Sequence, residues 1–195
     1  TQYLDRADVD APRLSAELLL AHALNCRKIE LYTRFDAVPD DNARSAFREL
    51  VRRAADHEPI AYLVAHKEFY SLDFEVSPAV LIPRPETELL VDRAVEFCRR
   101  TGEKPVRFID VGTGSGCIAV AILSQAKNAT GVATDVSAEA LEMAQRNRDR
   151  HKLADRLALF RADGLNLPSE ALAAGRFDML VSTPPYVPPG PLASL

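Results

Sequence analysis

The sequence predicts an α/β protein in which a doubly wound parallel sheet follows a small bundle of helices. From Val106 onward, short apolar runs alternate with helical ones, and a glycine-rich turn lies between the first such run and the helix after it. This alternation is typical of parallel strands joined by right-handed helical crossovers. The third observation is the helical periodicity of roughly the first 58 residues, which predicts the bundle.

Three helices are expected in the bundle. The first has Asp10 as its N-cap and Pro12 in its first turn, where the missing N–H costs little. The third begins near Asp40 or Asp41, after which apolar residues recur at helical spacing. The expected ranges are 11–24, 28–35 and about 41–57, within a helical domain of residues 1–58.

A change of pattern after Pro59 predicts a β-hairpin linker over residues 59–80. Aromatic and β-branched residues gather there in short segments, at 62–64, 69–70 and 72–76, which indicates a hairpin or two short strands. The third domain, residues 81–195, begins with an amphipathic helix that starts near Pro85 or Thr87. Its later elements are strands at 106–111, 131–134, 157–161 and 177–181, and helices at 116–126 and 138–151.

Composition restricts the classes of function. A net charge of −4 and a pI near 5.6 argue against a protein that grips nucleic-acid phosphates and favour a protein or small-molecule substrate. With no apolar run of about 18 residues and no signal peptide, a cytoplasmic protein without membrane contact is expected. The three cysteines and four histidines are scattered, so neither a disulfide framework nor a metal site is predicted.

The turn after the first strand is the expected cofactor site. Asp110 precedes three alternate glycines, Gly112, Gly114 and Gly116, with Thr113 among them. Residues without a Cβ let a ligand approach closely, and turns of this kind also bind diphosphates. A carboxylate at Asp110 would oppose a diphosphate but suits a ligand carrying an ammonium and a sulfonium, as S-adenosyl-L-methionine does. The alternative is an ordinary tight turn between a strand and a helix.

Two further acidic residues end neighbouring strands. Asp135 lies 19 residues after Gly116, near the spacing of about 20 at which an acidic residue binds ribose hydroxyls. Its alternative role is to cap the helix that starts around Ser137. After the third strand, Asp163 and Gly164 lie where a polar side chain can accept a hydrogen bond from an adenine amino group.

The segment after the fourth strand, Thr183-Pro184-Pro185-Tyr186, resembles the Asn-Pro-Pro-Tyr loop of methyltransferases that act on planar amide or amino nitrogens. In those enzymes the Asn oxygen and the first Pro carbonyl hold the NH2 group, and the Tyr packs on the substrate plane. Here Thr183 stands at the Asn position, where its hydroxyl accepts one hydrogen bond but is shorter. Loss of one positioned acceptor costs on the order of 10² in rate, so a loop without catalysis is the alternative.

With these motifs, residues 106–185 resemble class I methyltransferases, whose sheet is Rossmann-like. The upstream segments 68–72, 76–78 and 81–88 are similar to the PrmC/HemK family, which methylates the glutamine N5 of the Gly-Gly-Gln loop in peptide-chain release factors. The resemblance implies S-adenosyl-L-methionine as cofactor and a release factor as partner, recognised in part by the helical bundle. It also implies that Arg84, Glu86 and Glu88 border the substrate groove, against which helix capping and surface ion pairing are the alternative.

The family's sheet has seven strands, whereas this sequence stops just past the fourth, so we expect an incomplete sheet. Either the chain is truncated at its C-terminus or it is a naturally degraded member of the family, and its start at Thr1 without a methionine favours truncation. The exposed fourth strand would favour weak cofactor binding and association through that edge. Three other activities stay open: methylation of a ribosomal-protein glutamine, adenine-N6 methylation of nucleic acid, and cofactor binding without catalysis. The acidic charge and Pro83-Arg84-Pro85 argue against the nucleic-acid substrate. The sequence does not determine the oligomeric state.

Overall fold

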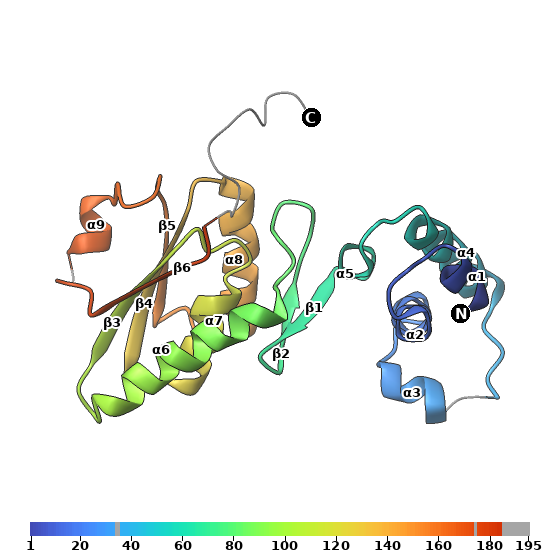
Figure 1. Ribbon diagram of the computed structural model, residues 1–195, viewed down its shortest axis with the longest axis horizontal. Coiled ribbons are helices and arrows are strands. Elements are labelled where there is room, and N and C mark those ends of the chain that lie inside the picture. Colours follow the sequence, from blue (N-terminus) through green and yellow to red (C-terminus); the bar gives the residue numbers. More distant parts are fainter. Residues whose placement is uncertain (34–35, 174, 185–195) are drawn as a thin grey trace. The chain divides into compact units, whose positions relative to one another are not determined.

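The protein divides into two compact units, Thr1–His66 and Lys67–Leu195, in a computed structural model that describes residues 1–33, 36–173 and 175–184 (Figure 1). The elements of the first unit are helices as far as Leu63, and the second contains an open parallel sheet with helices on both faces. The predicted α/β class with an N-terminal helical region is confirmed.

The helical unit contains the three expected helices and two that the sequence did not predict. The prediction that Asp10 caps the helix at 11–24 was wrong. The N-cap of this helix is Ala11, which has φ +44° and makes no side-chain hydrogen bond. The backbone carbonyl of Asp10 instead accepts a hydrogen bond from the Ser15 hydroxyl at 2.9 Å. Asp40 does cap the third helix, where its Oδ1 accepts from the Ala43 amide at 2.7 Å. The helices of this unit are α1 (Gln2–Arg6), α2 (Pro12–Ala23), α3 (Lys28–Thr33), α4 (Asp41–Ala55) and α5 (Ile60–Leu63).

The core of this unit is made by one apolar side of each long helix. Leu19 of α2 and Ala54 of α4 are buried against Leu4 of α1 and Leu63 of α5. The two unpredicted helices therefore complete the core of the α2–α4 pair. The strand-like interpretation of residues 62–64 was wrong, because Tyr62 and Leu63 belong to α5.

The predicted hairpin is formed by β1 (His66–Phe69) and β2 (Leu72–Glu75). Its two-residue turn, Tyr70-Ser71, has φ +53° and +58°, the left-handed values that a tight hairpin of type I′ requires. These residues have a Cβ, so the turn needs support from outside. Glu88 supplies it by accepting from the Tyr70 amide at 2.8 Å, and Asp92 accepts from the Tyr70 hydroxyl at 2.7 Å.

The sheet of the second unit has the order β5-β4-β3-β6, and all its neighbouring strands are parallel. The central strand β3 is buried on both faces, with Phe108 in one apolar cluster and Ile109 in another, as is usual for a central parallel strand. A Cβ at Gly131 in β4 would lie 2.6 Å from the ring of Phe108 in β3, so only glycine leaves room for that ring. The strands are β3 (Val106–Val111), β4 (Ala129–Asp135), β5 (Leu157–Arg161) and β6 (Met179–Ser182).

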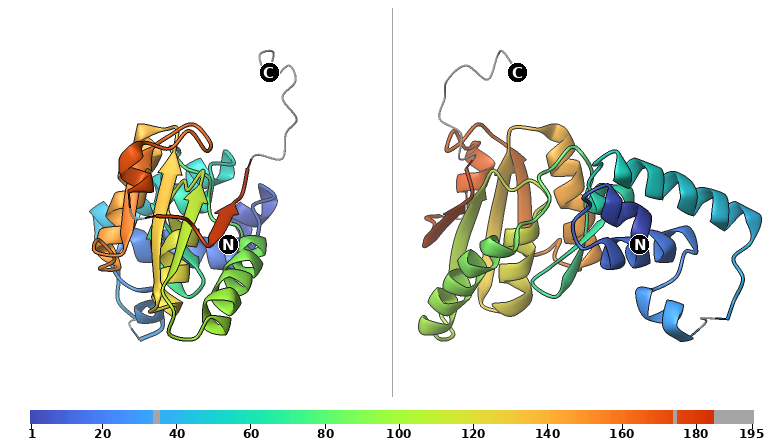
Figure 2. Two further views of the ribbon diagram at one scale, coloured as in Figure 1. Left: turned by 90° about the vertical axis from the view of Figure 1, so that its left-hand side faces the viewer. Right: turned by 45° about the vertical axis from the view of Figure 1, so that its right-hand side comes forward.

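Helices cover the two faces of the sheet unequally. Right-handed crossovers that move in one direction along the sheet place their helices on one face, and a crossover that returns places its helix on the other. The helix of the returning crossover is α9, and the left view of Figure 2 shows it on the opposite side of the strands from α6, which precedes β3. The helices are η1 (Pro85–Thr87), α6 (Glu88–Arg100), α7 (Cys117–Gln125), α8 (Ala138–Arg150) and α9 (Ser169–Leu172), the last of which the sequence did not predict.

Two apolar clusters hold these layers together. The larger one packs α6 and α7 against Phe108 of β3, with the hairpin residues Phe69 and Phe74 at its margin. The smaller one packs Ala171 of α9 against Ile109 and Val132 on the other face. The carboxyl ends of the strands are thereby fixed, and the turns that follow them carry the predicted site residues.

Candidate functional site

The turn between β3 and α7 is shaped by three glycines with positive φ: +74° at Gly112, +54° at Gly114 and +79° at Gly116. Their individual roles differ. A Cβ at Gly116 would lie 3.2 Å from the Cβ of Ala144 in α8, whereas a Cβ at Gly112 or Gly114 would meet no atom within 4 Å. Gly116 therefore allows α7 to pack closely on α8, and the other two leave their outer side open to a ligand.

The backbone of this turn is held by the end of β4. The amides of Gly112 and Thr113 both donate to the carbonyl of Thr134, at 2.9 Å each. The amide of Gly114 donates to Oδ2 of Asp135 at 2.9 Å. The glycine turn and Asp135, which are separate in the sequence, form one hydrogen-bonded unit.

Asp110 lies fully buried at the end of β3, beneath this turn. Its Oδ2 accepts a hydrogen bond from the Thr113 hydroxyl at 2.7 Å, and its Oδ1 has no partner among the described residues. Burial raises the pKa of Asp110 from 3.8 to about 6; the hydrogen bond from Thr113 and the nearby backbone of Ala119 lower it, and the charge of Asp135 raises it. A buried, ionised carboxylate with a free oxygen is stabilised by a nearby cation.

Both oxygens of Asp135 contact the backbone. While Oδ2 accepts from Gly114, Oδ1 accepts from the Ser137 amide at 3.0 Å. The N-cap of α8 is Ser137, whose hydroxyl accepts from the Ala140 amide at 3.1 Å. Asp135 thus supports the start of α8 without capping it, and each of its oxygens keeps a lone pair for a further donor.

The loop after β5 brings Asp163 and Gly164 to the same edge of the sheet. The Ala162 amide donates to the carbonyl of Asp135 at 3.0 Å, so the loop lies beside the end of β4. Both predicted residues are exposed, and Gly164 has φ +58°. Sequence reasoning missed two apolar residues here, Val136 and Leu165, whose exposed fractions are 62% and 65%. Large apolar side chains next to polar site residues are the signal that could have found them.

The predicted catalytic segment begins directly after β6, at Thr183 and Pro184. In the register of the sheet Ser182 lies opposite Val111, and its hydroxyl donates to the Val111 carbonyl at 2.8 Å. Thr183 is therefore the first residue past the strand end that adjoins the glycine turn. The predicted Pro185 and Tyr186 lie outside the described residues.

The predicted groove residues Arg84 and Glu86 are exposed at the start of α6. The Arg84 side chain makes no capping hydrogen bond to η1, and within the described ranges neither residue forms an ion pair. Glu88 differs, because its carboxylate accepts from the Tyr70 amide in the hairpin turn. The alternative role for these residues, helix capping and surface ion pairing, thus agrees in part with Glu88, which accepts a backbone hydrogen bond. It does not account for Arg84 or Glu86.

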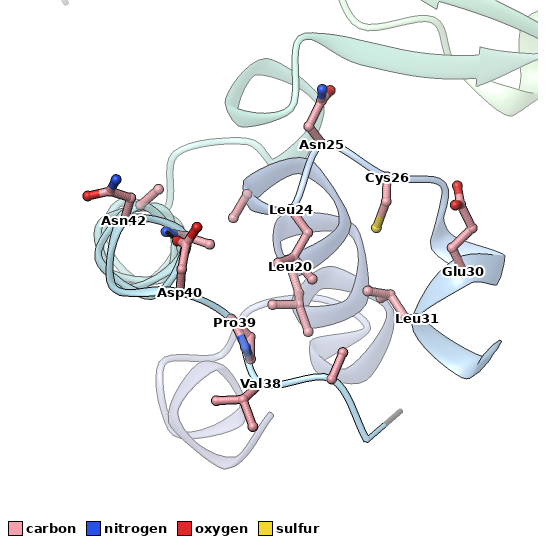
Figure 3. A pocket seen from close by; sticks show the side chains of 14 residues that line it. Leu20, Leu24, Asn25, Cys26, Glu30, Leu31, Val38, Pro39, Asp40 and Asn42 are labelled. Atoms are coloured by element: carbon pink, nitrogen blue, oxygen red, sulfur yellow. Dashed lines mark hydrogen bonds between the residues drawn. The ribbon is translucent and has the colours of Figure 1, made fainter. Parts of the chain in front are cut away.

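A cavity of about 720 Å³ lies in the helical unit among Leu20, Leu24, Leu31 and Val38 (Figure 3), and no predicted site residue lines it. Within residues 1–33, 36–173 and 175–184, His, Cys, Asp and Glu side chains form no cluster of three suited to a metal ion. No helix in these ranges combines the length and apolarity of a membrane span.

Two family descriptions match the chain. Residues 1–64 match the PrmC N-terminal domain, and residues 87–190 match the methyltransferase small domain. The second match contains the glycine turn, Asp135, Asp163 and Thr183.

Curated relatives match along almost the whole chain. Over 95% of its own length, this chain is 46% identical to a release factor glutamine methyltransferase of Nitratidesulfovibrio vulgaris. Proteins with the same name from Rhodopirellula baltica and Chlorobaculum tepidum are 44% and 40% identical, each over 96% of the chain. The chain spans 61%, 63% and 65% of the lengths of these three proteins.

Solved structures with the same architecture include the human METTL16 methyltransferase domain. A crystal form of that domain has a TM-score of 0.51 at 20% identity, covering 72% of this chain and 55% of its own. The N-terminal domain of METTL16 in complex with SAH gives 0.50 at 21% identity, covering 60% of this chain and 47% of its own. These similarities concern the fold alone. The family is shown by the match over residues 87–190, which is more than half of the chain: the chain belongs to the methyltransferase small domain family.

Proposed function

We propose that this chain carries the cofactor and catalytic residues of an S-adenosyl-L-methionine-dependent methyltransferase that modifies the glutamine N5 of the Gly-Gly-Gln loop in release factors. The observation that carries the proposal is the 40 to 46% identity to three release factor glutamine methyltransferases over nearly the whole chain. The described site geometry fits the same activity.

The fit to the cofactor rests on Asp110 and the glycine turn. When bound, S-adenosyl-L-methionine supplies an electrophilic methyl group on a positively charged sulfonium. The buried Oδ1 of Asp110 has no hydrogen-bond partner among the residues that the structure describes, and a ligand ammonium near it would stabilise the ionised carboxylate. The open outer sides of Gly112 and Gly114 leave space for a ligand at van der Waals distance from the backbone. Thr113 holds the other oxygen of Asp110 in place.

The nucleoside would be held by the ends of β4 and β5. Asp135 is oriented by two backbone amides and retains acceptor capacity for ribose hydroxyls. Asp163, beside Gly164, would accept from the adenine amino group. Val136 and Leu165 expose large apolar side chains directly after β4 and in the loop after β5, and an adenine ring would cover such surface favourably.

Methyl transfer to an amide nitrogen needs acceptors that hold the NH2 group, because the nitrogen lone pair is delocalised. We assign this role to the Thr183 hydroxyl and the Pro184 carbonyl. Pro185 would fix the loop and Tyr186 would pack on the plane of the amide. Thr183 lies past the strand end that adjoins the glycine turn. The residues proposed to hold the cofactor and those proposed to hold the amide would therefore lie at the same carboxyl end of the strands.

The substrate side of the proposal assigns Arg84 and Glu86 to the groove that receives the release factor. Both side chains are exposed and lack ion-pair partners among the described residues, so they are available to a partner protein. In this organisation residues 1–58 serve substrate recognition, 59–80 link the domains, and 81–195 bind the cofactor. A cytoplasmic location follows from a substrate that acts in translation.

The test is a calorimetric titration of the chain with S-adenosyl-L-methionine, followed by a transfer assay with labelled cofactor and a release factor. Micromolar binding that Asp135→Ala weakens at least about tenfold is expected, since charge-assisted hydrogen bonds contribute about 1.5–3 kcal/mol. Absence of binding to the wild-type chain would contradict the cofactor site.

A second variant separates binding from catalysis. Thr183→Asn restores the longer amide acceptor and is expected to raise the transfer rate by a factor on the order of 10², with cofactor affinity unchanged. Transfer to release factor by neither the wild type nor this variant, despite cofactor binding, would leave a cofactor-binding protein without this activity.

A further inference from the structure

Asn147 in α8 is a buried polar side chain that the site described above does not use. It is 0% exposed, and its amide group makes three hydrogen bonds to two distant backbone segments. Oδ1 accepts from the Glu75 amide at 2.7 Å, while Nδ2 donates to the Glu75 carbonyl at 3.0 Å and to the Ser115 carbonyl at 2.8 Å. One side chain thus joins the end of β2 to the glycine turn.

The segment that leaves this joint is residues 76–87, which we call the connecting segment. It begins at Val76, next to the Asn147 contact, and contains Arg84 and Glu86. Its far end is also fixed, because Glu88 accepts from the Tyr70 amide in the hairpin turn. Buried Val76, Val80 and Pro83 anchor it between these points.

The hydrogen bonds of Asn147 differ in burial from the other contacts between α8 and β2. Arg146 and Arg150 form ion pairs with Glu75 and Asp73, at 3.1 and 2.9 Å, but these side chains are partly exposed, and such pairs contribute little. The bonds of Asn147 are buried, and removing the side chain would leave three backbone groups without partners. Among these contacts Asn147 alone also reaches the glycine turn.

We propose that Asn147 is a positioning residue that couples the glycine turn to the connecting segment, so that ligand binding at the turn also orders the segment that carries Arg84 and Glu86. The coupling passes through the Ser115 carbonyl, the Asn147 amide and the Glu75 backbone. It deepens the proposed function by linking cofactor binding to the substrate side, and that ligand-dependent part rests on the proposed cofactor site.

The first experiment needs no cofactor. Hydrogen–deuterium exchange of the unliganded chain is compared for the wild type, Asn147→Ala and Arg146→Ala; the last removes a contact to the same Glu75 without touching the glycine turn. Asn147→Ala should raise exchange at least about tenfold both in residues 74–80 and in the glycine turn, 112–116. Arg146→Ala should leave the turn unchanged. Unchanged exchange of the turn in Asn147→Ala would overturn the coupling.

The second experiment adds S-adenosyl-L-methionine. In the wild type and in Arg146→Ala, exchange should slow in both the glycine turn and the connecting segment, whereas in Asn147→Ala it should slow in the turn alone. Equal slowing of the connecting segment in all three proteins would refute the proposal, since a merely structural role predicts that result.

If Asn147→Ala does not fold, Asn147→Ser, which keeps a small polar side chain, is compared in the same way. If the wild type binds no cofactor in the calorimetric titration, the proposed function fails, and the unliganded comparison still decides whether Asn147 couples the two segments.

Discussion

The cofactor side and the substrate side of the proposed site are built differently. On the cofactor side, Asp110 is fully buried, Asp135 is held by two backbone amides, and the glycine turn is bonded to β4. On the substrate side, Arg84 and Glu86 are exposed and make no ion pair within the described residues. The fold thus preorganises the side that would take a small ligand, whereas the other side consists of side chains free to adjust to a partner protein.

The largest expected effect follows from removing the buried charge. Asp110→Asn keeps the shape of the side chain but cannot attract a cation, so cofactor affinity should fall about 10- to 100-fold in a calorimetric titration. Ionising Asp110 within the fold costs about 3 kcal/mol, because its pKa rises from 3.8 to about 6. The unliganded variant should therefore be at least as stable as the wild type at pH 7.5. Lower stability with unchanged affinity would contradict this role.

The pH dependence tests the same group without a substitution. The folded-state pKa lies above the unfolded value, so the contribution of Asp110 to stability is present below about pH 4 and is lost as pH rises through about 6. Cofactor affinity should change in the opposite sense, falling about tenfold between pH 7 and pH 5 as the carboxylate is protonated. Asp110→Asn is the control, and its affinity should not follow this profile.

A matched pair of glycine substitutions separates ligand access from packing on the cofactor side. Gly114→Ala places a Cβ in open space at φ +54°, so it should cost about 1 kcal/mol of stability and lower cofactor affinity about tenfold. Gly116→Ala adds a contact of 3.2 Å with Ala144 and should cost about 2 kcal/mol or more. Thermal unfolding and titration measure both effects; equal losses of stability would show that the two glycines do not differ in role.

The smallest effect is expected on the substrate side. Arg84→Ala should weaken binding of a release factor several-fold, about 1 kcal/mol, while stability and cofactor affinity stay within about 0.5 kcal/mol. Arg93→Ala, which removes an exposed arginine paired with Glu96 on α6, is the matched control. Equal effects of the two substitutions on release factor binding would remove Arg84 from the groove.

The sheet could be predicted because its signals are local. The bounds of β3 and β5 agree with the apolar runs at 106–111 and 157–161, since turn residues flank each run. The short helices α1, α5 and α9 could not be predicted, because four or five residues contain too little periodicity and packing decides their conformation.

The common position of the candidate site residues could be predicted in part for the same reason. Asp110, Asp135 and the glycines follow strand ends, and their order along the chain indicates their common position. Asn147 could not be found in this way, because its partners lie 72 and 32 residues away in the sequence. From the sequence alone, an asparagine on a charged helix is interpreted as a solvated residue, because the backbone groups that it binds are close to it only in the folded protein.

The order of strands in the sheet has one more consequence. The chain moves outward from β3 to β4 and β5, then returns to place β6 on the other side of β3. Between β3 and β6 the order reverses, and the turns that leave these two strands diverge at this topological switch point. Thr183, the first residue past the end of β6, can therefore vary without disturbing the apolar layers below, whereas Gly112 past β3 has φ +74° and is restricted to glycine by its backbone. A new acceptor at residue 183 is thus a change that evolution or mutagenesis can make at little cost to folding.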